Sequence, residues 1–439
     1  MRSMKKLLAL ALTATMSATL LVGCGGDDAG TTSQNPGSAT GTTAEAGGSS
    51  DAGSGETQDI TLKVWCPQNQ VDSGIMEEQQ AAFAAEHPEY NITWTTEVVG
   101  EDKCSENVLK DVDAAADVFM FANDQTYAMV EAGALAQLGG EAESMVKDNM
   151  TEDVAKTVTY TDGGIYGIPF THNTFIMFYD KTLLEEGDIA SLEKIMAKET
   201  ADNVYNFYFE SAGGWKLGCY YYGAGLSVFG PDGSDLAAGV DWNSDKGVAV
   251  TNYLIDLINN KKCAYDGEIA VSELIAEHRL GAWFDGAWNY DMYKEALGDD
   301  LGMATIPTFN PDGTDYQLLG FYGSKAIGVN AHSQNMAAAV QFATFLGNEE
   351  NQVLRFEKSA QVPTNKTAGE SDAVTSDALA KAIVEEANTA SVAQPQNSVF
   401  STRYWNYAGA IATEIRSGEI TKDNVKEKLD SFVQSMTAE

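Results

Sequence analysis

Strand and helix patterns alternate along most of this chain, and the alternation restricts the fold more than any other feature. Residues 60–65 alternate apolar and polar side chains like a strand, residues 74–88 carry a helical stripe, and residues 91–98 return to a strand pattern. Further apolar strands and helical runs are expected at 117–121, 127–135, 175–179, 247–260, 282–284 and 335–360. This order predicts an α/β protein with two lobes built on parallel-rich sheets.

The strong acidic excess excludes two kinds of partner. The 439 residues include 64 Asp or Glu and 27 Lys or Arg, which gives a formal net charge of −37. Such a surface repels the phosphates of nucleic acids and the headgroups of anionic lipids, so binding to nucleic acid and direct adhesion to anionic lipid are not expected. The charge keeps a protein soluble but does not identify its ligand.

The first residues carry the signals of an exported lipoprotein. Arg2, Lys5 and Lys6 precede an apolar run at 7–22 that is too short to span a bilayer comfortably, and the run ends in Leu21-Val-Gly-Cys24. This segment resembles a bacterial lipoprotein signal, which implies cleavage of residues 1–23, a diacylglyceryl group on Cys24 and anchoring at the extracellular face of the cytoplasmic membrane. An ordinary secretory peptide with an incidental cysteine is the alternative.

The next segment has the composition of a tether. Residues 24–58 are dominated by Gly, Ser, Thr, Ala and Asp, and such a segment buries too little apolar surface to offset its ordering entropy. The body that follows is long enough for two domains, and it contains no later stretch with the length of a transmembrane helix.

The body shows no pattern typical of a metal, cofactor or catalytic site. Its cysteines at 66, 104, 219 and 263 do not have zinc-site spacing, and an exported location allows either two disulfides or buried thiols. The histidines are scattered without an HExxH pattern. Ser191-Leu-Glu-Lys194 matches the SxxK pattern of serine acylases, but no SDN or KTG partner follows. We therefore expect no cofactor, no metal and no enzymatic activity.

Six motifs in collinear order identify the body by resemblance. They are Ala116-Asp-Val-Phe-Met-Phe-Ala-Asn-Asp124, Asp162-Gly-Gly-Ile-Tyr-Gly-Ile-Pro169, Tyr179-Asp-Lys181, Phe284-Asp-Gly-Ala-Trp288, Gly302-Met-Ala-Thr-Ile-Pro307 and Gly323-Ser-Lys-Ala-Ile-Gly-Val329. Together, over about residues 60 to 435, they resemble the extracellular solute-binding proteins of sugar ABC importers. The similarity is greatest to the maltose/maltodextrin-binding branch of Gram-positive type.

The resemblance implies a two-lobed periplasmic-binding-protein-like fold of type II, with a ligand cleft between lobes joined by three chain crossings. It places the crossings near 170–174, 307–309 and 361–365. The N-terminal lobe would comprise 59–170 with 308–364, and the C-terminal lobe 171–307 with 365–439. Hinge closure around the ligand is the motion expected of such a fold.

Three tryptophans match aromatic positions of that family. Trp215 lies beside Gly213-Gly214, Trp288 follows an apolar strand, and Trp405 lies in Arg403-Tyr-Trp-Asn406. Sugars present flat C–H faces with hydroxyl rims, so such rings would stack on them while polar groups bind the hydroxyls. A core packing role is the alternative for Trp215 and Trp288.

Residues at positions that match the family's polar and wall contacts complete the predicted set of ligand-binding residues. Asp124 and Gln125 follow one strand, Asn173 follows Pro169, and the remaining candidates are Gln68, Asn69, Asn406 and Phe121. The family often has arginine in place of Gln125 and glutamate in place of Asn173, so the identity of the sugar is less defined than its class. Asp124 has a turn-stabilising role as its alternative, and Phe121 a core role.

These residues predict a monomeric receptor that hands maltose or a maltooligosaccharide to ABC permease subunits. Another oligosaccharide or small solute is the nearest alternative. A surface glycoside hydrolase would need a general acid and a second carboxylate in the cleft, where the resemblance places Asn173, Gln125 and Asn406 instead. A surface adhesin would need neither a hinge nor cleft tryptophans.

The resemblance of the first residues to a lipoprotein signal leads to the first prediction. Cys24→Ala removes the thiol that would carry the acyl chains, so the variant should be released from the membrane while its body stays folded. Fractionation after a mild wash, followed by immunoblotting, measures the retained share. Full membrane retention of the folded variant would contradict lipid anchoring through Cys24.

Overall fold

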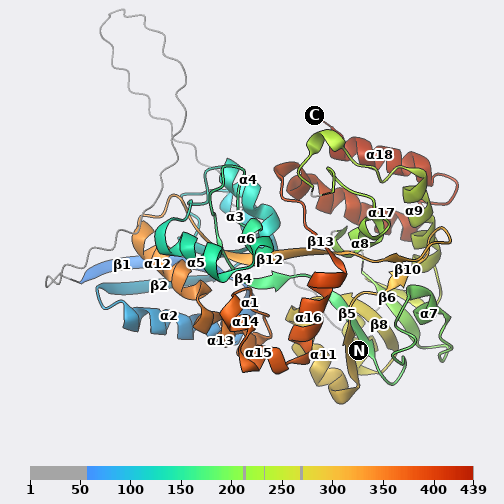
Figure 1. The fold of residues 1–439 in the computed structure, drawn as a ribbon, viewed down its shortest axis with the longest axis horizontal. Coiled ribbons are helices and arrows are strands. Elements are labelled where there is room, and N and C mark those ends of the chain that lie inside the picture. Colours follow the sequence, from blue (N-terminus) through green and yellow to red (C-terminus); the bar gives the residue numbers. More distant parts are fainter. Residues whose placement is uncertain (1–56, 211–213, 232, 267–269, 439) are drawn as a thin grey trace, which may run out of the picture. The chain divides into compact units, whose positions relative to one another are not determined.

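Two β-sheets organise the part of the chain that the structure describes. This structure is a computed structural model, and it describes residues 57–438 apart from 211–213, 232 and 267–269. The signal segment, Cys24 and nearly all of the expected tether lie outside the described residues. Figure 1 shows the two sheets with their surrounding helices.

The first sheet has the strand order β13-β12-β3-β1-β2, and β4 also pairs with β12. Strand β1 runs parallel to β2 and β3, whereas β12 runs antiparallel to both β3 and β4. The strands are β1 (Gln58–Cys66), β2 (Tyr90–Val98), β3 (Val118–Ala122), β4 (Ile168–Asn173), β12 (Gly320–Val329) and β13 (Ser391–Ala393).

The second sheet has the order β7-β6-β8-β5-β9. Strand β6 is parallel to β7 and β8, and β5 is antiparallel to β8 and β9. The strands are β5 (Ile176–Asp180), β6 (Tyr205–Phe209), β7 (Cys263–Tyr265), β8 (Leu280–Asp285) and β9 (Leu301–Ala304). A separate antiparallel pair, β10 (Thr308–Phe309) and β11 (Tyr316–Gln317), lies between β9 and β12 in the sequence.

Helices fill the connections between these strands. The α-helices are α1 (Gln68–Asp72), α2 (Ile75–Glu86), α3 (Cys104–Val108), α4 (Thr126–Glu131), α5 (Gly140–Asn149), α6 (Glu152–Lys156), α7 (Leu192–Ala197), α8 (Trp215–Gly223), α9 (Asp245–Ile258), α10 (Val271–Ala276), α11 (Tyr290–Leu297), α12 (Met336–Gly347), α13 (Glu349–Ser359), α14 (Lys366–Gly369), α15 (Asp372–Ser376), α16 (Ala378–Thr389), α17 (Trp405–Ser417) and α18 (Val425–Thr437). The short turns used below are η1 (Glu101–Lys103), η2 (Asn123–Gln125) and η5 (Ala287–Asn289), with a π-helix η7 (Phe400–Tyr404) before α17.

Each sheet is buried against its helices. The second sheet packs on both faces, because Ile176 and Phe178 of β5 belong to one apolar core and Met177 belongs to another. This alternation follows from the two-residue period of a strand. The first sheet has its own core, which β3 and β12 share with α12.

Most strand pairings of the two sheets are parallel, as expected. The exceptions are β5, which is antiparallel to β8 and β9, and β12, which is antiparallel to β3 and β4. Both lie next to a passage of the chain between the two sheets. The chain passes from the first sheet to the second between β4 and β5, and returns between β9 and β12. Strand β13, which was assigned to the C-terminal lobe, pairs with β12 in the first sheet.

The long helical run expected at 335–360 is two helices. Asn348 has an extended backbone with φ −69° and ψ 169°, which ends α12, and its side chain accepts a hydrogen bond from the Asn351 amide to cap α13. A Cβ at Gly347 would lie 2.3 Å from Cγ2 of Ile168, so glycine allows α12 to approach β4 closely.

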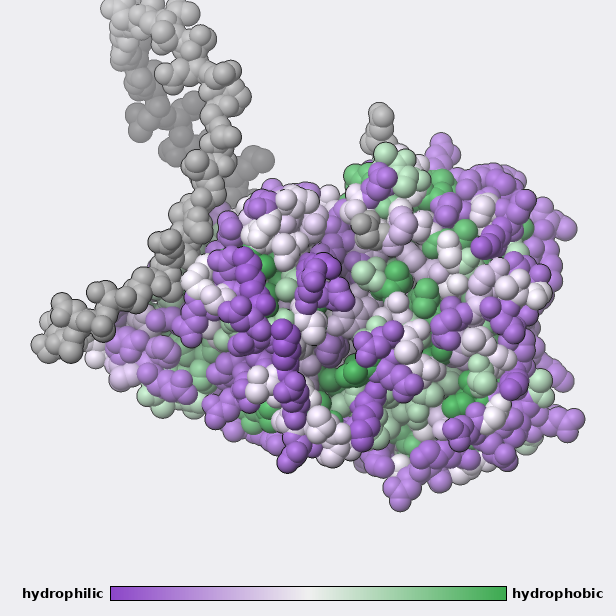
Figure 2. All heavy atoms as spheres, in the orientation of Figure 1, coloured by the Kyte–Doolittle hydropathy of each residue, from purple (hydrophilic) through white to green (hydrophobic). Residues whose placement is uncertain are grey.

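The sequence left open whether the cysteines of the body form disulfides or remain buried thiols, and the structure shows the state of three of them. Cys66, Cys104 and Cys219 are buried free thiols, so the alternative with two disulfides does not hold in this structure. Burial raises the pKa of the Cys66 thiol to about 12, which makes it a poor nucleophile. No helix among the described residues has the length and apolarity that a membrane crossing requires. Hydrophilic side chains dominate the face shown in Figure 2.

Candidate functional site

Two of the predicted tryptophans form a stacked pair at the ends of second-sheet strands. Trp215 is the first residue of α8 after β6, and Trp288 lies in η5 directly after β8. Their ring centroids are 5.6 Å apart with 28° between the ring planes. Trp288 keeps 38% of its surface exposed, while Trp215 is half-buried and meets the edge of Phe175 at 4.8 Å. The pair offers a rigid aromatic surface beside solvent.

The third tryptophan contacts a carboxylate that follows a first-sheet strand. Trp405 begins α17, and its Nε1 donates a hydrogen bond of 3.0 Å to Oδ2 of Asp124 in η2, the turn after β3. Asp124 is only 7% exposed, and this burial raises the pKa of its carboxyl group to about 7, although the Trp405 N–H acts in the opposite direction. Asp124 is therefore a buried acid that titrates near neutral pH.

A lysine and a glutamate that sequence reasoning did not select complete the cluster. Lys325 of β12 places its Nζ 4.8 Å from the ring centroid of Trp288 and 3.3 Å from Oε1 of Glu101 in η1. Both charged side chains are nearly buried. A cation over an indole face gains electrostatic attraction, and the carboxylate pairs its charge. The sequence signal that could have identified Lys325 is its place as the single cation in the motif Gly323-Ser-Lys-Ala-Ile-Gly-Val329.

The side chains of Gln125 and Phe121 are buried inside the fold and are not exposed to a ligand. The Gln125 side chain accepts from the Ser105 amide at 2.7 Å and donates to the Glu101 carbonyl at 2.7 Å, so it fixes the turn that carries Glu101. Phe121 is fully buried in the core of the first sheet and meets Phe119 edge to face. Phe121 has no exposed surface to form the expected sugar wall, because β3 is buried along its whole length.

The other predicted polar residues lie at several places in the fold. Gln68 is exposed and donates to Asp72 within α1. Asn69 is half-buried, and its Oδ1 is buried without a hydrogen-bond partner. Asn173 is half-buried on β4 opposite Gly323, and Asn406 is exposed at the start of α17. Within the described residues, no hydrogen bond, ion pair or ring contact joins these four to the tryptophans.

The six residues Trp215, Trp288, Trp405, Asp124, Lys325 and Glu101 are called the aromatic cluster below. Its members come from both sheets, because η1, η2 and β12 belong to the first, and η5 and α8 follow strands of the second. Trp405 packs against the apolar core that contains residues of β6 and β8 in the second sheet. Its contact with Asp124 and that of Trp288 with Lys325 therefore join the two sides directly.

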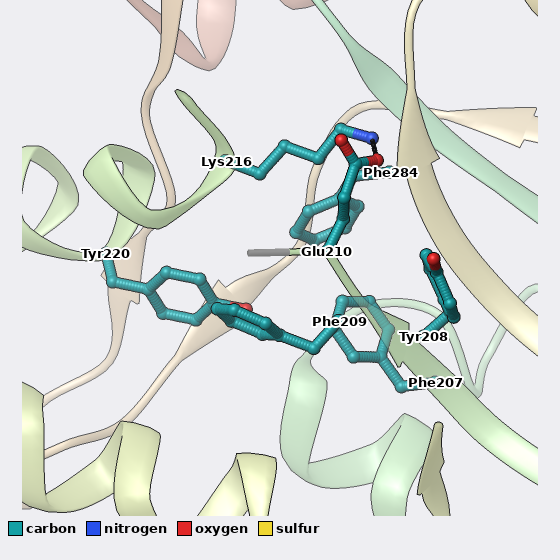
Figure 3. Close-up of a pocket in the computed structure, with 7 residues that line it drawn as sticks. All are labelled: Phe207, Tyr208, Phe209, Glu210, Lys216, Tyr220 and Phe284. Atoms are coloured by element: carbon teal, nitrogen blue, oxygen red, sulfur yellow. Dashed lines mark hydrogen bonds and ion pairs between the residues drawn. The ribbon is translucent and has the colours of Figure 1, made fainter. Parts of the chain in front are cut away.

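Two hollows among the described residues lie at different places around the second sheet. A cavity of about 10 Å³, close to the smallest space that holds one water, is lined by residues of β6 together with Lys216, Tyr220 and Phe284. Figure 3 shows its lining, where Lys216 meets Glu210. A surface hollow of about 380 Å³ is lined by Lys181, Lys198 and Val204, near the other end of the second sheet. A ligand of the cluster would therefore need the side chains that join its two sides to separate.

The cluster has the chemistry of a binding site for a polar molecule with apolar faces. It combines indole faces with a carboxylate and a lysine ammonium, which serve as acceptor and donor for hydroxyl groups. The described residues contain no group of three or more His, Cys, Asp or Glu suited to a metal ion.

Comparisons with known proteins identify several similar proteins. The family model described as bacterial extracellular solute-binding protein matches residues 78–382. A maltooligosaccharide ABC transporter solute-binding lipoprotein of Streptococcus pneumoniae is 27% identical over 394 residues, which cover 85% of this chain and 84% of that protein. The galactooligosaccharide-binding protein of Bacillus subtilis is 26% identical over 289 residues, 62% of this chain and 65% of that protein. A solved structure with acarbose is 38% identical, with a TM-score of 0.81, and the match covers 87% of this chain and 99% of that one.

The pKa of Asp124 predicts a pH dependence of stability. Its folded pKa of about 7 lies above the unfolded value of about 4, so the folded state binds more protons between these pH values. The wild-type protein should therefore lose stability relative to Asp124→Asn as pH rises from about 5 to about 7, by at most about 1.4 kcal/mol per pH unit.

Urea unfolding of both proteins across this pH range measures the difference. Glu386 has a pKa raised by burial to about 8 and contributes a similar slope, but it is present in both proteins and cancels. Parallel stability curves would show that Asp124 does not titrate as the structure indicates.

Proposed function

Because this chain belongs to the bacterial extracellular solute-binding protein family, we propose that it captures maltose or short maltooligosaccharides for an ABC importer. The Streptococcus pneumoniae relative is named for maltooligosaccharides, and the similar solved structure contains acarbose. Permease subunits in the membrane would receive the sugar from the bound protein. The protein itself would act as a monomer, held at the extracellular face of the cytoplasmic membrane by a lipid on Cys24.

The stacked pair of Trp215 and Trp288 is the observation that carries this proposal. An indole face matches the C–H face of a glucose unit, and the exposed part of the stacked pair would take such a unit. Asp124 and Lys325 would bind hydroxyl groups from the first-sheet side. Since their contacts with Trp405 and Trp288 join the two sides, entry of a sugar requires the lobes to move apart and then close around it.

The contacts of the nearby carboxylates support binding without catalysis. Asp124 accepts from Trp405, Glu101 pairs with Lys325, and Asp285 contacts Lys216. A glycosidase needs one carboxyl group that protonates the leaving oxygen and a second that faces it across the scissile bond. In this cluster each carboxylate is instead engaged by a neighbouring donor.

A galactooligosaccharide is the second candidate ligand, because the Bacillus subtilis relative is named for it. Calorimetry of the soluble body against maltose, maltotriose, longer maltodextrins and a β-galactooligosaccharide distinguishes the two. We expect binding of the α-glucans, with no shorter products in the recovered solution by chromatography. Preferential binding of the β-galactooligosaccharide would replace the maltooligosaccharide assignment, and reproducible hydrolysis would overturn the receptor function.

Tryptophan variants test the cluster itself. Trp288→Ala should weaken maltotriose binding by about 1 to 3 kcal/mol, or roughly 5- to 150-fold, because a stacking ring is lost. Its melting temperature should change little, since the side chain is 38% exposed. Trp215→Ala and Trp405→Ala should weaken binding by similar factors.

Trp283→Ala is the matched control, since Trp283 lies five residues earlier and is buried in the core of the second sheet. It should cost about 3 to 5 kcal/mol of stability and leave the affinity of the folded fraction unchanged. Unchanged affinity in all three cluster variants would remove the cluster from the binding site.

A further inference from the structure

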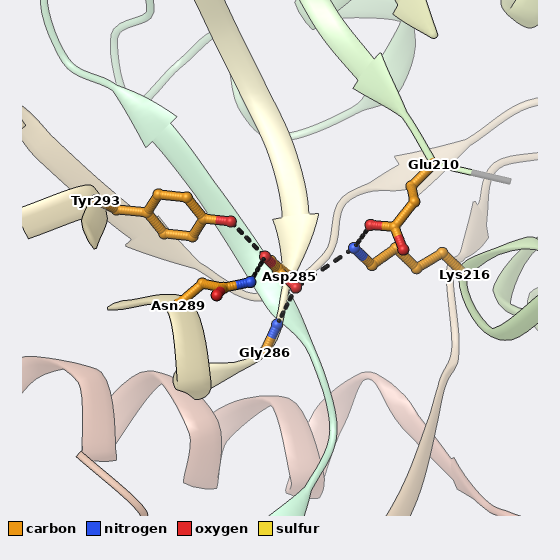
Figure 4. A network of polar contacts seen from close by, with 6 residues as sticks. All are labelled: Glu210, Lys216, Asp285, Gly286, Asn289 and Tyr293. Atoms are coloured by element: carbon orange, nitrogen blue, oxygen red, sulfur yellow. Dashed lines mark hydrogen bonds and ion pairs between the residues drawn. The ribbon is translucent and has the colours of Figure 1, made fainter. Parts of the chain in front are cut away.

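Asp285, the last residue of β8, accepts several hydrogen bonds in the layer behind the stacked tryptophans. Its carboxylate accepts from the Gly286 amide at 2.8 Å, from Nδ2 of Asn289 at 2.8 Å and from the hydroxyl of Tyr293. Nζ of Lys216 lies 3.4 Å from its Oδ1. Figure 4 shows these groups converging on one carboxylate, which is only 7% exposed.

Two of these donors fix the turn that carries Trp288. Gly286 precedes η5 and Asn289 ends it, so a single carboxylate binds both ends of the turn. The indole of Trp288 lies over Gly286, where a Cβ would be 2.1 Å from ring atoms Cζ3 and Cη2. Glycine at 286 therefore permits the ring position, and the bonds of Asp285 hold the turn in that conformation.

A third donor links Asp285 to the other tryptophan. Lys216 follows Trp215 in α8, and its ammonium lies between Asp285 and Glu210 with 7% of the side chain exposed. A buried ammonium needs paired charges, so these two carboxylates hold Lys216 and with it the first turn of α8, which begins with Trp215.

We propose that Asp285 is a positioning residue that fixes both indoles of the stacked pair and thereby presents a preformed surface to the ligand. The geometric part depends only on the contacts above, whereas the role in binding rests on the proposed sugar-binding function. Trp288 is partly exposed, and a fixed turn restricts the rotamers that its indole can adopt. Holding it in the bound geometry reduces the entropy that the ligand must overcome.

Circular dichroism separates positioning from a general role in stability. Two indoles 5.6 Å apart couple their electronic transitions, and the spectrum of the wild-type protein minus that of Trp288→Phe isolates the signal of this pair. Asp285→Asn keeps the shape of the side chain but removes the charge that Lys216 faces and places an amide against the other donors. We expect this variant to remain folded, to lose most of the pair signal, and to bind maltotriose about ten-fold more weakly.

Asp180→Asn is the matched control. Asp180 is also a buried aspartate at the end of a second-sheet strand, but it accepts from Thr182 and contacts His278 at the opposite end of the sheet. This variant should retain both the pair signal and the affinity. If Asp285→Asn does not fold, Asn289→Ala removes one bond to the turn and should lower the pair signal in part.

The outcomes separate this proposal from the proposed function. An unchanged pair signal in folded Asp285→Asn, or in Asn289→Ala where that variant is used instead, overturns the positioning role whatever the protein binds. A lost signal with unchanged maltotriose affinity overturns the link between positioning and binding. A lost signal in a protein whose wild type binds no sugar supports the positioning of the indoles and contradicts the proposed function alone.

Discussion

The placement of the aromatic cluster depends on the register of strand β12 in the first sheet. Lys325 pairs with Ala122 of β3 and with Thr171 of β4, and the pairing with β4 shifts register directly after Lys325. Such an irregularity redirects a side chain at the end of a sheet. A slip of one residue would turn Lys325 to the other face, away from Glu101 and Trp288. The contact between the two sides of the cluster thus follows from backbone pairing.

Buried charge is paired throughout the cluster except at one group. Lys325 faces Glu101, and Lys216 lies between Glu210 and Asp285. Among the residues that the structure describes, Asp124 has the indole N–H of Trp405 and no such cation in contact, and burial raises its pKa to about 7. A hydroxyl group donated by a sugar would favour the ionised form of this carboxylate. Asp124 is therefore the group of the cluster whose protonation a ligand would alter most.

Local patterns in the sequence predicted much of the fold, because strand and helix periods are local properties. The strands near 60, 91, 117, 175 and 282 are present within one or two residues, and helix α9 (Asp245–Ile258) begins and ends two residues before the run expected at 247–260. Helix 335–360 was predicted as one element, since a polar residue such as Asn348 ends a helix only through its backbone conformation. The antiparallel placement of β5 and β12 is a property of topology that periodicity does not contain.

The candidate site could be predicted only in part. Family resemblance located the three tryptophans and Asp124, which the structure brings into two contacting pairs. It did not locate Lys325 with Glu101, or Asp285 with Lys216, because these contacts join residues far apart in the chain. Gln125 and Phe121 matched family positions but have internal partners here, so a position in an alignment does not establish exposure.

A crystal structure of the soluble body with maltotriose would show whether the aromatic cluster holds the sugar. We expect glucose rings stacked within about 4 Å of Trp215 and Trp288, with a hydroxyl group bonded to Asp124. We also expect the contacts joining the two sides of the cluster to be rearranged around the sugar. Maltotriose bound elsewhere on the body, with all three tryptophans free of contact, would contradict the assignment of the aromatic cluster as the ligand site.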